Sequence, residues 1–268
     1  MKRITIFISL LTILTSCNNN KPEPENPGQM MSNAAPANIS YNIVASYPHD
    51  SESYTQGLVW HNNILYEGTG LEGHSKLMKV DLKSGKEQGE SVKLPNDVFG
   101  EGITILNQKI YQLSWQNRKV FVYDANTFKK INEMHWEHEG WGITTDGKDL
   151  IVSTGESNIY FVDPETFKIK KTLAVKDNNG PVGNLNELEY VNGSIYSNIY
   201  LTDYIIKINP IDGTITGKLD MNGLLEKAGK QVNREDGLVL NGIAYDSSKN
   251  SFYITGKKWP LMFEMKLN

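Results

Sequence analysis

Short runs of alternating hydrophobic and polar residues, separated by turn signals, follow one another along most of the chain. Asp146-Gly147 separates the runs at residues 141–145 and 150–152, and Asn192-Gly193 separates those at 186–190 and 195–197. Asn-Gly and Asp-Gly between such runs are strong β-hairpin signals. The pattern therefore predicts antiparallel strands joined by tight turns.

The first run of each hairpin belongs to a repeat that occurs five times. The copies are residues 56–60, 101–105, 141–145, 186–190 and 241–245. Their first residues are 45, 40, 45 and 55 positions apart. A third run and a fourth, more polar run complete most copies. Four antiparallel strands in a unit of 40 to 45 residues are the signature of a propeller blade.

The repeat predicts an all-β fold, a five-bladed β-propeller with four antiparallel strands per blade. The fifth unit ends with its third strand, at residues 261–267. A strand near residues 40–47 precedes the first unit, and we expect it to supply the missing strand and close the ring, which removes free sheet edges. The longest interval holds a short helical turn at 223–228. A β-sandwich has similar strand spacing but would not repeat one first-strand pattern five times.

The N-terminus has the features of a processing segment rather than of the fold. Lys2 and Arg3 precede a mostly apolar run of 11 residues, 4–14, which is too short to span a bilayer. Leu14-Thr15-Ser16-Cys17 resembles a bacterial lipobox, which implies cleavage before Cys17 and lipidation of its thiol. We expect residues 1–16 to be a lipoprotein signal peptide, 17–38 a disordered, proline-rich lipid tether and 39–268 the five-bladed propeller.

Composition and charge narrow the classes of partner. The net charge is −4 and Lys and Arg are spread along the chain, so nothing indicates nucleic-acid binding. Cys17 is the only cysteine, which leaves the mature domain without a disulfide. The expected location is the bacterial cell envelope, at the periplasmic or the surface face of the outer membrane. We expect a monomeric propeller that is held to the membrane through lipidated Cys17 alone.

Equivalent positions of the repeat should form a ring at one end of the central axis. The first positions of the five copies are Gln56, Glu101, Trp141, Asn186 and Asn241. The second strand of each hairpin returns to the same rim and places a second set there: Gly70, Trp115, Gly155, Tyr200 and Lys257. Framework residues repeat between blades, whereas these positions diverge into a carboxylate, an ammonium, carboxamides and aromatics. That divergence predicts a single ligand site at the mouth of the channel.

Each of these residues also has an ordinary structural explanation. A Trp at a blade end usually packs in the core, a Glu between glycines is usually a turn residue, and an Asn at a strand start often bonds its own backbone. The shared repeat positions favour the functional interpretation. His135 and His138 lie three residues apart in a predicted outer strand or its loop, and they would be on opposite faces of a strand, which disfavours a metal site there. The sequence contains no phosphate-binding glycine loop, serine nucleophile elbow or zinc spacing.

The motifs at these positions resemble those of a known family, the plant- and bacterial-type glutamine cyclotransferases. The resemblance covers nearly all of residues 46–267 in order and includes the segments 54–57, 65–71, 99–102, 140–142, 185–190, 239–244 and 255–260. It implies a five-bladed propeller enzyme, an aminoacyltransferase that converts an N-terminal glutaminyl residue of a peptide or protein to pyroglutamyl and releases ammonia.

The resemblance also implies roles for individual residues. Glu101 matches the proton-transfer carboxylate of the family, and Phe99 matches the aromatic residue before it. The other matches to family active-site positions are Gln56, Trp115, Trp141, Asn186 and Lys257. Tyr54 and Tyr200 stand where plant members have Phe and Trp, which leaves substrate preference in doubt. Residues 153–155 lack an Asp that is common in that family loop.

These residue types suit the reaction. The α-amine and the γ-carbonyl already belong to one residue, so they need orienting rather than capture. Glu101 can take a proton from the amine and deliver it to the leaving ammonia. Lys257, Asn186 and Gln56 can hold the carbonyl oxygens, while Trp115, Trp141 and Tyr200 can stack on the side chain and exclude water. Asn241, Tyr54 and Phe99 complete the predicted substrate-binding set.

The predicted mechanism needs no cofactor and no catalytic metal. The sequence leaves a structural cation in the channel open, because no motif names its ligands. Two rival functions remain. One is a non-catalytic propeller that binds peptides or a small ligand. The other is a lactonase-like hydrolase, which would need several acidic metal ligands in the channel, where this rim has one acid.

Overall fold

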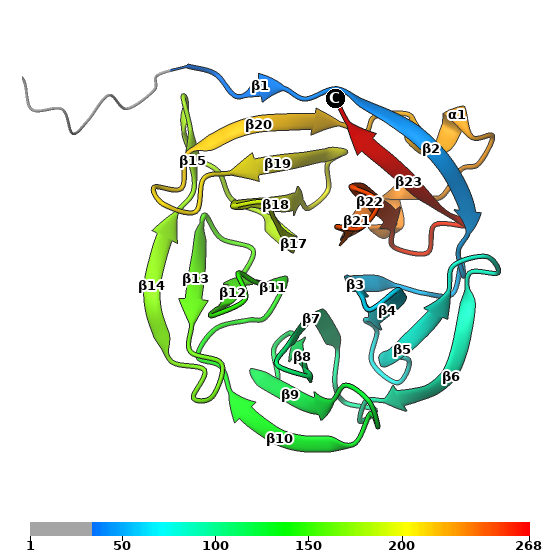
Figure 1. Cartoon of the computed structure of the whole chain (residues 1–268), viewed down its shortest axis with the longest axis vertical. Coiled ribbons are helices and arrows are strands. Elements are labelled where there is room, and N and C mark those ends of the chain that lie inside the picture. The colour runs from blue at the N-terminus through cyan, green and yellow to red at the C-terminus, as the bar shows by residue number, and fades with distance from the viewer. Residues whose placement is uncertain (1–33) are drawn as a thin grey trace, which may run out of the picture. The chain divides into compact units, whose positions relative to one another are not determined.

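The computed structural model describes residues 34–268, in which five sheets of four or five strands are arranged around a central axis (Figure 1). Helix in this part of the chain is limited to α1 (Leu224–Lys227) and a 3₁₀ turn (Arg234–Asp236). Both lie in the connection between the fourth and fifth blades, where the sequence predicted a helical turn. The predicted five-bladed propeller is confirmed.

The first three blades follow the predicted four-strand pattern, with consecutive strands paired antiparallel. Blade 1 is β3 (Thr55–His61), β4 (Ile64–Thr69), β5 (Lys76–Asp81) and β6 (Lys86–Lys93). Blade 2 is β7 (Gly100–Leu106), β8 (Lys109–Ser114), β9 (Lys119–Asp124) and β10 (Lys130–His135). Blade 3 is β11 (Ile143–Thr145), β12 (Leu150–Ser153), β13 (Asn158–Val162) and β14 (Ile169–Ala174). The first strand of each blade lies nearest the axis (Figure 1).

The last two blades each include a strand from the start of the described chain. Blade 4 is β17 (Leu185–Val191), β18 (Ser194–Ile199), β19 (Tyr204–Ile208) and β20 (Ile215–Asp220), with β1 (Ala37–Asn38) parallel to β20. Blade 5 is β21 (Leu240–Asp246), β22 (Ser251–Gly256) and β23 (Leu261–Leu267), with β2 (Tyr41–Pro48) antiparallel to β23. A hairpin of β15 (Lys176–Asp177) and β16 (Gly180–Pro181) connects blades 3 and 4.

Strand β1 shows that the folded domain begins earlier than the predicted residue 39. The sequence assigned residues 17–38 to a disordered tether, yet Ala37 and Asn38 pair with Gly217 and Lys218. The Ile39 backbone N–H donates to the Lys218 carbonyl at 2.8 Å. The Ile39 side chain packs over Gly217, where an added Cβ would lie 2.4 Å from it. The contact with a glycine draws the preceding residues onto the blade, so order begins before residue 39. The predicted signal peptide and most of the tether lie outside the described residues.

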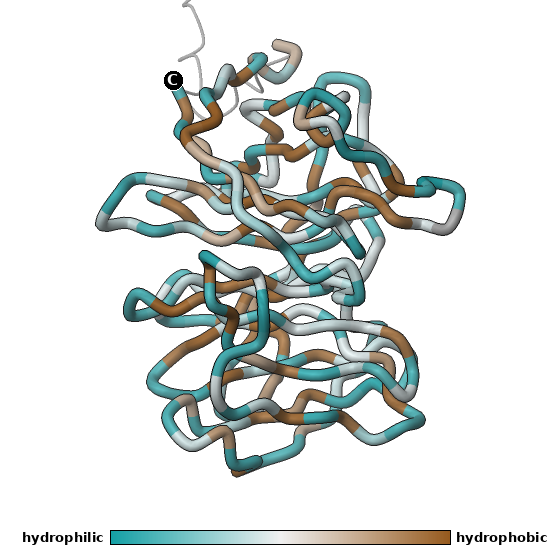
Figure 2. The backbone as a smooth tube through the Cα atoms, turned by 90° about the vertical axis from the view of Figure 1, so that its right-hand side faces the viewer, coloured by the Kyte–Doolittle hydropathy of each residue, from teal (hydrophilic) through white to brown (hydrophobic). Residues whose placement is uncertain are grey.

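The hydrophobic core lies between neighbouring blades. One cluster joins Val59, Tyr66 and Leu77 of blade 1 to Ile103 and Phe121 of blade 2. Equivalent clusters join each of the other adjacent pairs, blades 5 and 1 included. Seen from the side, hydrophobic segments run through the strands and hydrophilic turns occupy the outer edge (Figure 2). Each blade therefore buries both faces against its neighbours, and the ring supports whatever lies at its mouth.

A repeated aspartate turn connects the third and fourth strands of the first three blades. Asp81 accepts hydrogen bonds from the backbone N–H and the hydroxyl of Ser84. Asp124 and Thr127 make the same pair of contacts, as do Asp163 and Thr166. An Asp side chain that bonds its own backbone replaces a backbone turn, which explains why this spacing recurs along the sequence.

Candidate active site

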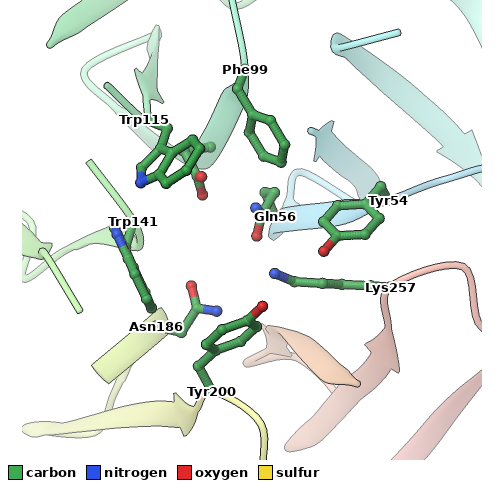
Figure 3. Close-up of a pocket in the computed structure, with 9 residues that line it drawn as sticks. Tyr54, Gln56, Phe99, Trp115, Trp141, Asn186, Tyr200 and Lys257 are labelled. Atoms are coloured by element: carbon green, nitrogen blue, oxygen red, sulfur yellow. The ribbon is translucent and has the colours of Figure 1, made fainter. Parts of the chain in front are cut away.

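A cavity of about 210 Å³ opens at the rim where the innermost strands begin (Figure 3). Its size suits a single residue rather than a drug-sized ligand. Nine residues from all five blades line it: Tyr54, Gln56, Phe99, Glu101, Trp115, Trp141, Asn186, Tyr200 and Lys257. The sequence predicted every one of them for the site, and the structure brings them together across two hundred positions of the chain.

Bulges in the innermost strands direct the first set of these side chains into the cavity. The pairing of β3 with β4 shifts between Thr55 and Gly57, on either side of Gln56. The same shift occurs in β7 around Glu101 and in β17 around Asn186. A bulge turns a side chain away from the regular alternation of the strand. The repeated glycine after the functional residue belongs to this local geometry.

Left-handed turns place the second set. Trp115, Tyr200 and Lys257 directly follow the ends of β8, β18 and β22. The residues after the last two, Leu201 and Lys258, have φ values of 64° and 56°. Such conformations are uncommon for residues other than glycine. They reverse the chain at the mouth, so that the side chain before the reversal points into the cavity.

The two glycines predicted at the rim make room for aromatic side chains instead of facing a ligand. A Cβ on Gly70 would lie 2.3 Å from the ring of Phe99. A Cβ on Gly155 would lie 2.6 Å from the ring of Trp141, and Gly155 has a φ of +79°. Larger residues at either position would displace an aromatic wall of the cavity.

Glu101 is the acidic residue that lines the cavity, and it is 4 % exposed. Burial raises its pKa well above the usual value of 4.5. Lys257 opposes this shift and Glu139 adds to it. No hydrogen bond from the described residues contributes to the pKa of this carboxyl. From the sequence alone the balance between the aromatic surroundings and Lys257 was undecided, and in the structure burial prevails.

Lys257 is the cation of the cavity and lies between two tyrosine rings. Its Nζ is 4.8 Å from the ring centroid of Tyr54 and 4.6 Å from that of Tyr200. Burial lowers its pKa from 10.5 to about 8, although Glu101 pulls the pKa upward. Two cation–π contacts hold the ammonium in place without neutralising it. Tyr54 and Tyr200 therefore flank the one lysine that lines the cavity.

Two carboxamides present polar groups to the cavity. Asn186 is 3 % exposed, and its Oδ1 accepts no hydrogen bond from the described residues. Gln56 Oε1 accepts from Asn241 Nδ2 at 3.2 Å, which leaves the Gln56 amide N–H groups to face the cavity. An unsatisfied amide at the edge of a pocket is available to a ligand.

Asn241 does not line the cavity, in contrast to its predicted role as a substrate-binding residue. It is fully buried behind Gln56 and donates from Nδ2 to the Thr55 carbonyl at 2.9 Å as well as to Gln56. The repeat aligned Asn241 with the other rim residues. In blade 5 this side chain lies against β3 of blade 1, where it holds the Gln56 amide.

Aromatic rings form the walls of the cavity. Phe99 makes edge contacts with Tyr54 and Trp115, at centroid distances of 6.0 and 5.8 Å. Trp141 makes an edge contact with Tyr200 at 5.5 Å. Figure 3 shows these rings surrounding the polar ends of Gln56, Asn186 and Lys257. Edge-to-face contacts of this kind hold each ring in one orientation.

A carboxylate that the sequence analysis did not select lies behind two of these rings. Glu139 Oε2 accepts from Trp115 Nε1 at 2.7 Å and from Trp141 Nε1 at 3.4 Å. Glu139 falls outside the repeated rim positions, in the connection between β10 and β11. The one sequence feature that could have pointed to Glu139 is its position two residues before Trp141, a predicted site residue.

Metal-binding groups are not assembled in the described part of the chain. Within residues 34–268, no three His, Cys, Asp or Glu side chains are arranged to hold an ion. His138 stacks on Tyr160 at a centroid distance of 4.9 Å, and His135 is exposed on β10. Cys17, the predicted lipidation site, lies outside the described residues.

Three comparisons place the chain among known proteins. Residues 9–267 match the glutamine cyclotransferase family. A glutaminyl-peptide cyclotransferase of Arabidopsis thaliana is 39% identical over 231 residues, which are 84% of this chain and 70% of that protein. The crystal structure of Myxococcus xanthus glutaminyl cyclase superposes with a TM-score of 0.80 at 32% identity, over 87% of this chain and 98% of that one. The chain therefore belongs to the glutamine cyclotransferase family.

Proposed function

We propose that the protein is a glutaminyl-peptide cyclotransferase, which converts the N-terminal glutaminyl residue of peptides or proteins to pyroglutamyl and releases ammonia. The observation that carries the proposal is the cavity itself. It combines one buried carboxylate, one buried ammonium and two carboxamides inside aromatic walls. Family membership and the names of both relatives agree with this activity.

Glu101 transfers the proton. As the amine nitrogen attacks the γ-carbonyl carbon, the carboxylate accepts a proton from that nitrogen and then gives it to the departing amide nitrogen, which leaves as ammonia. The raised pKa of Glu101 suits this cycle, because a group that both accepts and donates works best when its pKa lies near the operating pH. Removing such a group typically lowers the rate roughly 10²–10⁴-fold.

Lys257, Asn186 and Gln56 orient the substrate and hold charge. Negative charge develops on the γ-carbonyl oxygen during attack, and an ammonium fixed between two rings is a preorganised partner for it. The Gln56 N–H groups donate in the same direction, with Asn241 fixing the amide. The unpartnered Asn186 Oδ1 is an acceptor for the substrate amine.

The aromatic walls enclose the glutaminyl side chain. Phe99, Trp115 and Trp141 offer flat apolar faces to its methylene groups and amide. Enclosure keeps water from the γ-carbonyl, so that the intramolecular amine attacks in place of hydroxide. The product then carries a lactam instead of a free acid.

Ammonia release from a panel of dipeptides that begin with Gln tests the function. A dipeptide with a free α-amine should give ammonia and a pyroglutamyl product, in which that amine nitrogen has become part of the lactam. A dipeptide with an acetylated amine should give neither. Ammonia from the acetylated peptide would identify an amidase instead. Saturable binding of the dipeptides without any turnover would identify a binding propeller.

We also propose that the chain works at the bacterial cell envelope as a monomer, attached to the outer membrane by lipid on Cys17. Within residues 34–268 no helix is long and apolar enough to span a membrane. Support for the anchor is the lipobox-like sequence alone. Labelling cells with a radioactive fatty acid tests it: the wild-type chain should carry label and fractionate with membranes, and the Cys17→Ser variant should do neither. A soluble, unlabelled wild-type chain would contradict the anchor, and size-exclusion chromatography tests the monomer.

A further inference from the structure

Glu139 connects two blades at the edge of the active-site cavity. It lies between β10 and β11, and its side chain reaches Trp115 at the end of β8 and Trp141 just before β11. Both indole nitrogens lie on ring edges turned away from Lys257 (Figure 3). One carboxylate oxygen, Oε2, accepts both N–H groups. A hydrogen bond to a charged acceptor is roughly twice as strong as a neutral one.

The backbone around Glu139 is itself held firmly. The Glu139 carbonyl accepts from Trp136 Nε1 at 3.2 Å, and the ring of Trp136 is buried. The Gly140 N–H donates to the Ser114 carbonyl at 3.3 Å. A Cβ on Gly140 would lie 2.8 Å from that carbonyl and from Leu113, so this turn packs directly on blade 2. The carboxylate therefore projects from a fixed support, which a positioning residue requires.

The two tryptophans need such support. Trp115 is 37% exposed, and an exposed indole on a loop end can rotate about its side-chain bonds. Phe99 restrains one edge of Trp115, and Tyr200 and Gly155 restrain Trp141. Hydrogen bonds from both indole N–H groups to Glu139 add a directional restraint that apolar ring contacts lack.

We propose that Glu139 is a positioning residue for the glutaminyl substrate: it locks the ring planes of Trp115 and Trp141, so that the two indoles form a fixed slot for the substrate side chain. The proposal rests on the proposed function of the cavity. Glu139 does not line the cavity and acts through the two indoles. Since the slot contacts the substrate in the ground state and in the transition state alike, its loss should appear mainly in KM.

Two substitutions separate the hydrogen bonds from the charge. Glu139→Ala removes the oxygen that accepts both indole N–H groups. It should lower kcat/KM roughly 10–100-fold, mostly through KM, as expected for losing hydrogen bonds to a charged group. Glu139→Gln keeps an acceptor oxygen and should recover most of that loss. Glu137→Gln is the matched control, because Glu137 is an exposed acid on the same segment that carries neither contact. It should behave as the unchanged protein.

Indole fluorescence tests the positions of Trp115 and Trp141 in the absence of substrate. Trp136 bonds the Glu139 backbone, so side-chain substitutions leave that contact in place, and the expected change in emission comes from Trp115 and Trp141. Glu139→Ala should alter the emission and its accessibility to iodide, while Glu139→Gln should alter it less. This readout stands even if no Gln peptide is turned over, so failure of the proposed function is distinguishable from failure of the positioning role.

A double-mutant cycle covers the case in which Glu139→Ala does not fold. Trp115→Phe keeps a flat ring but removes the N–H, and its effect should be much smaller in a Glu139→Leu background, which lacks the acceptor but fills the space, than in the unchanged protein. Additive effects, or a Glu139→Ala variant within twofold of the unchanged kcat/KM with unchanged emission, would overturn the proposal. Equal losses in Glu139→Ala and Glu139→Gln would overturn it too, since charge alone would then be responsible.

Discussion

Two buried glutamates of the innermost strands, Glu101 and Glu187, have different roles although they occupy adjacent positions of the repeat. Glu101 and Glu187 are both almost inaccessible, and burial raises the pKa of each well above its usual value. Glu187 occupies the repeat position that holds glycine in the other blades. Its Oε1 accepts from Leu58 N at 3.2 Å and its Oε2 from Ile243 N at 2.9 Å. It therefore connects blades 1 and 5 through blade 4.

Glu101 differs in its partners rather than in its burial. No hydrogen bond from the described residues stabilises its carboxylate, which faces a cavity and a buried ammonium instead. A buried charge whose oxygens are all satisfied is part of the framework, whereas one left open towards a pocket can exchange protons with a ligand. A raised pKa alone does not separate the two roles.

The largest expected effect in this comparison is on turnover. Glu101→Gln should lower kcat for Gln-initiated dipeptides roughly 10²–10⁴-fold, because the amide cannot carry the proton. Thermal unfolding should occur at an unchanged or higher temperature, since the substitution removes a buried acid without hydrogen-bond partners. Coupled ammonia detection and calorimetry measure the two quantities. Turnover within threefold of the unchanged protein would refute the proton-transfer role.

The complementary substitution should affect stability. Glu187→Ala leaves the N–H groups of Leu58 and Ile243 without their acceptors, which should lower the free energy of unfolding by about 3 kcal/mol. The folded fraction should keep kcat within threefold. Urea unfolding and active-site-normalised kinetics check both statements. A large loss of kcat with unchanged stability would mean that the two glutamates do not divide the roles in this way.

The pH dependence of activity tests whether Lys257 lowers the pKa of Glu101. The acid limb of kcat/KM reports ionisation of Glu101 in the free enzyme, so it should lie well above pH 4.5. Because Lys257 lowers the pKa of Glu101, Lys257→Gln should move that limb to higher pH as well as reduce the rate. An acid limb near pH 4.5, or one that moves down in the variant, would contradict the assignment.

The smallest expected effect concerns a second framework carboxyl, Glu189, whose pKa burial raises to about 8. Its neutral form is favoured in the folded state, so its contribution to stability is present in full below the unfolded pKa of 4.5 and is lost as pH rises to about 8. Glu189→Gln should flatten the decline of stability over this window. Urea midpoints measured across the window test it, and an equally steep decline in the variant would show that other groups cause it.

Prediction from the sequence succeeded where the repeat carried the information. The recurrence of one strand pattern, with turn signals at fixed places, determined the number of blades and the rim positions of Glu101, Asn186 and Lys257. It did not reveal the surroundings of two residues. Asn241 shares the repeat position, but its side chain lies against β3 of blade 1. Glu139 lies outside the repeat, so the pattern could not select it although it contacts two predicted residues.

The start of the folded domain also depends on contacts that the local sequence does not reveal. Residues 17–38 are polar and rich in proline, but two backbone pairs to β20 and the Ile39 side chain over Gly217 order the last of them. Local composition cannot reveal a partner that lies about 180 residues away.

By itself, the sequence determined the strands, their grouping into five units and the residue types that meet at one rim, because local periodicity and turn chemistry are written into neighbouring residues. Only the tertiary structure decided which of those residues face the cavity, which carboxylate is satisfied and which is open, and that the pKa of Glu101 rises despite Lys257. These depend on burial and on distances between blades, and both exist only once the ring has assembled.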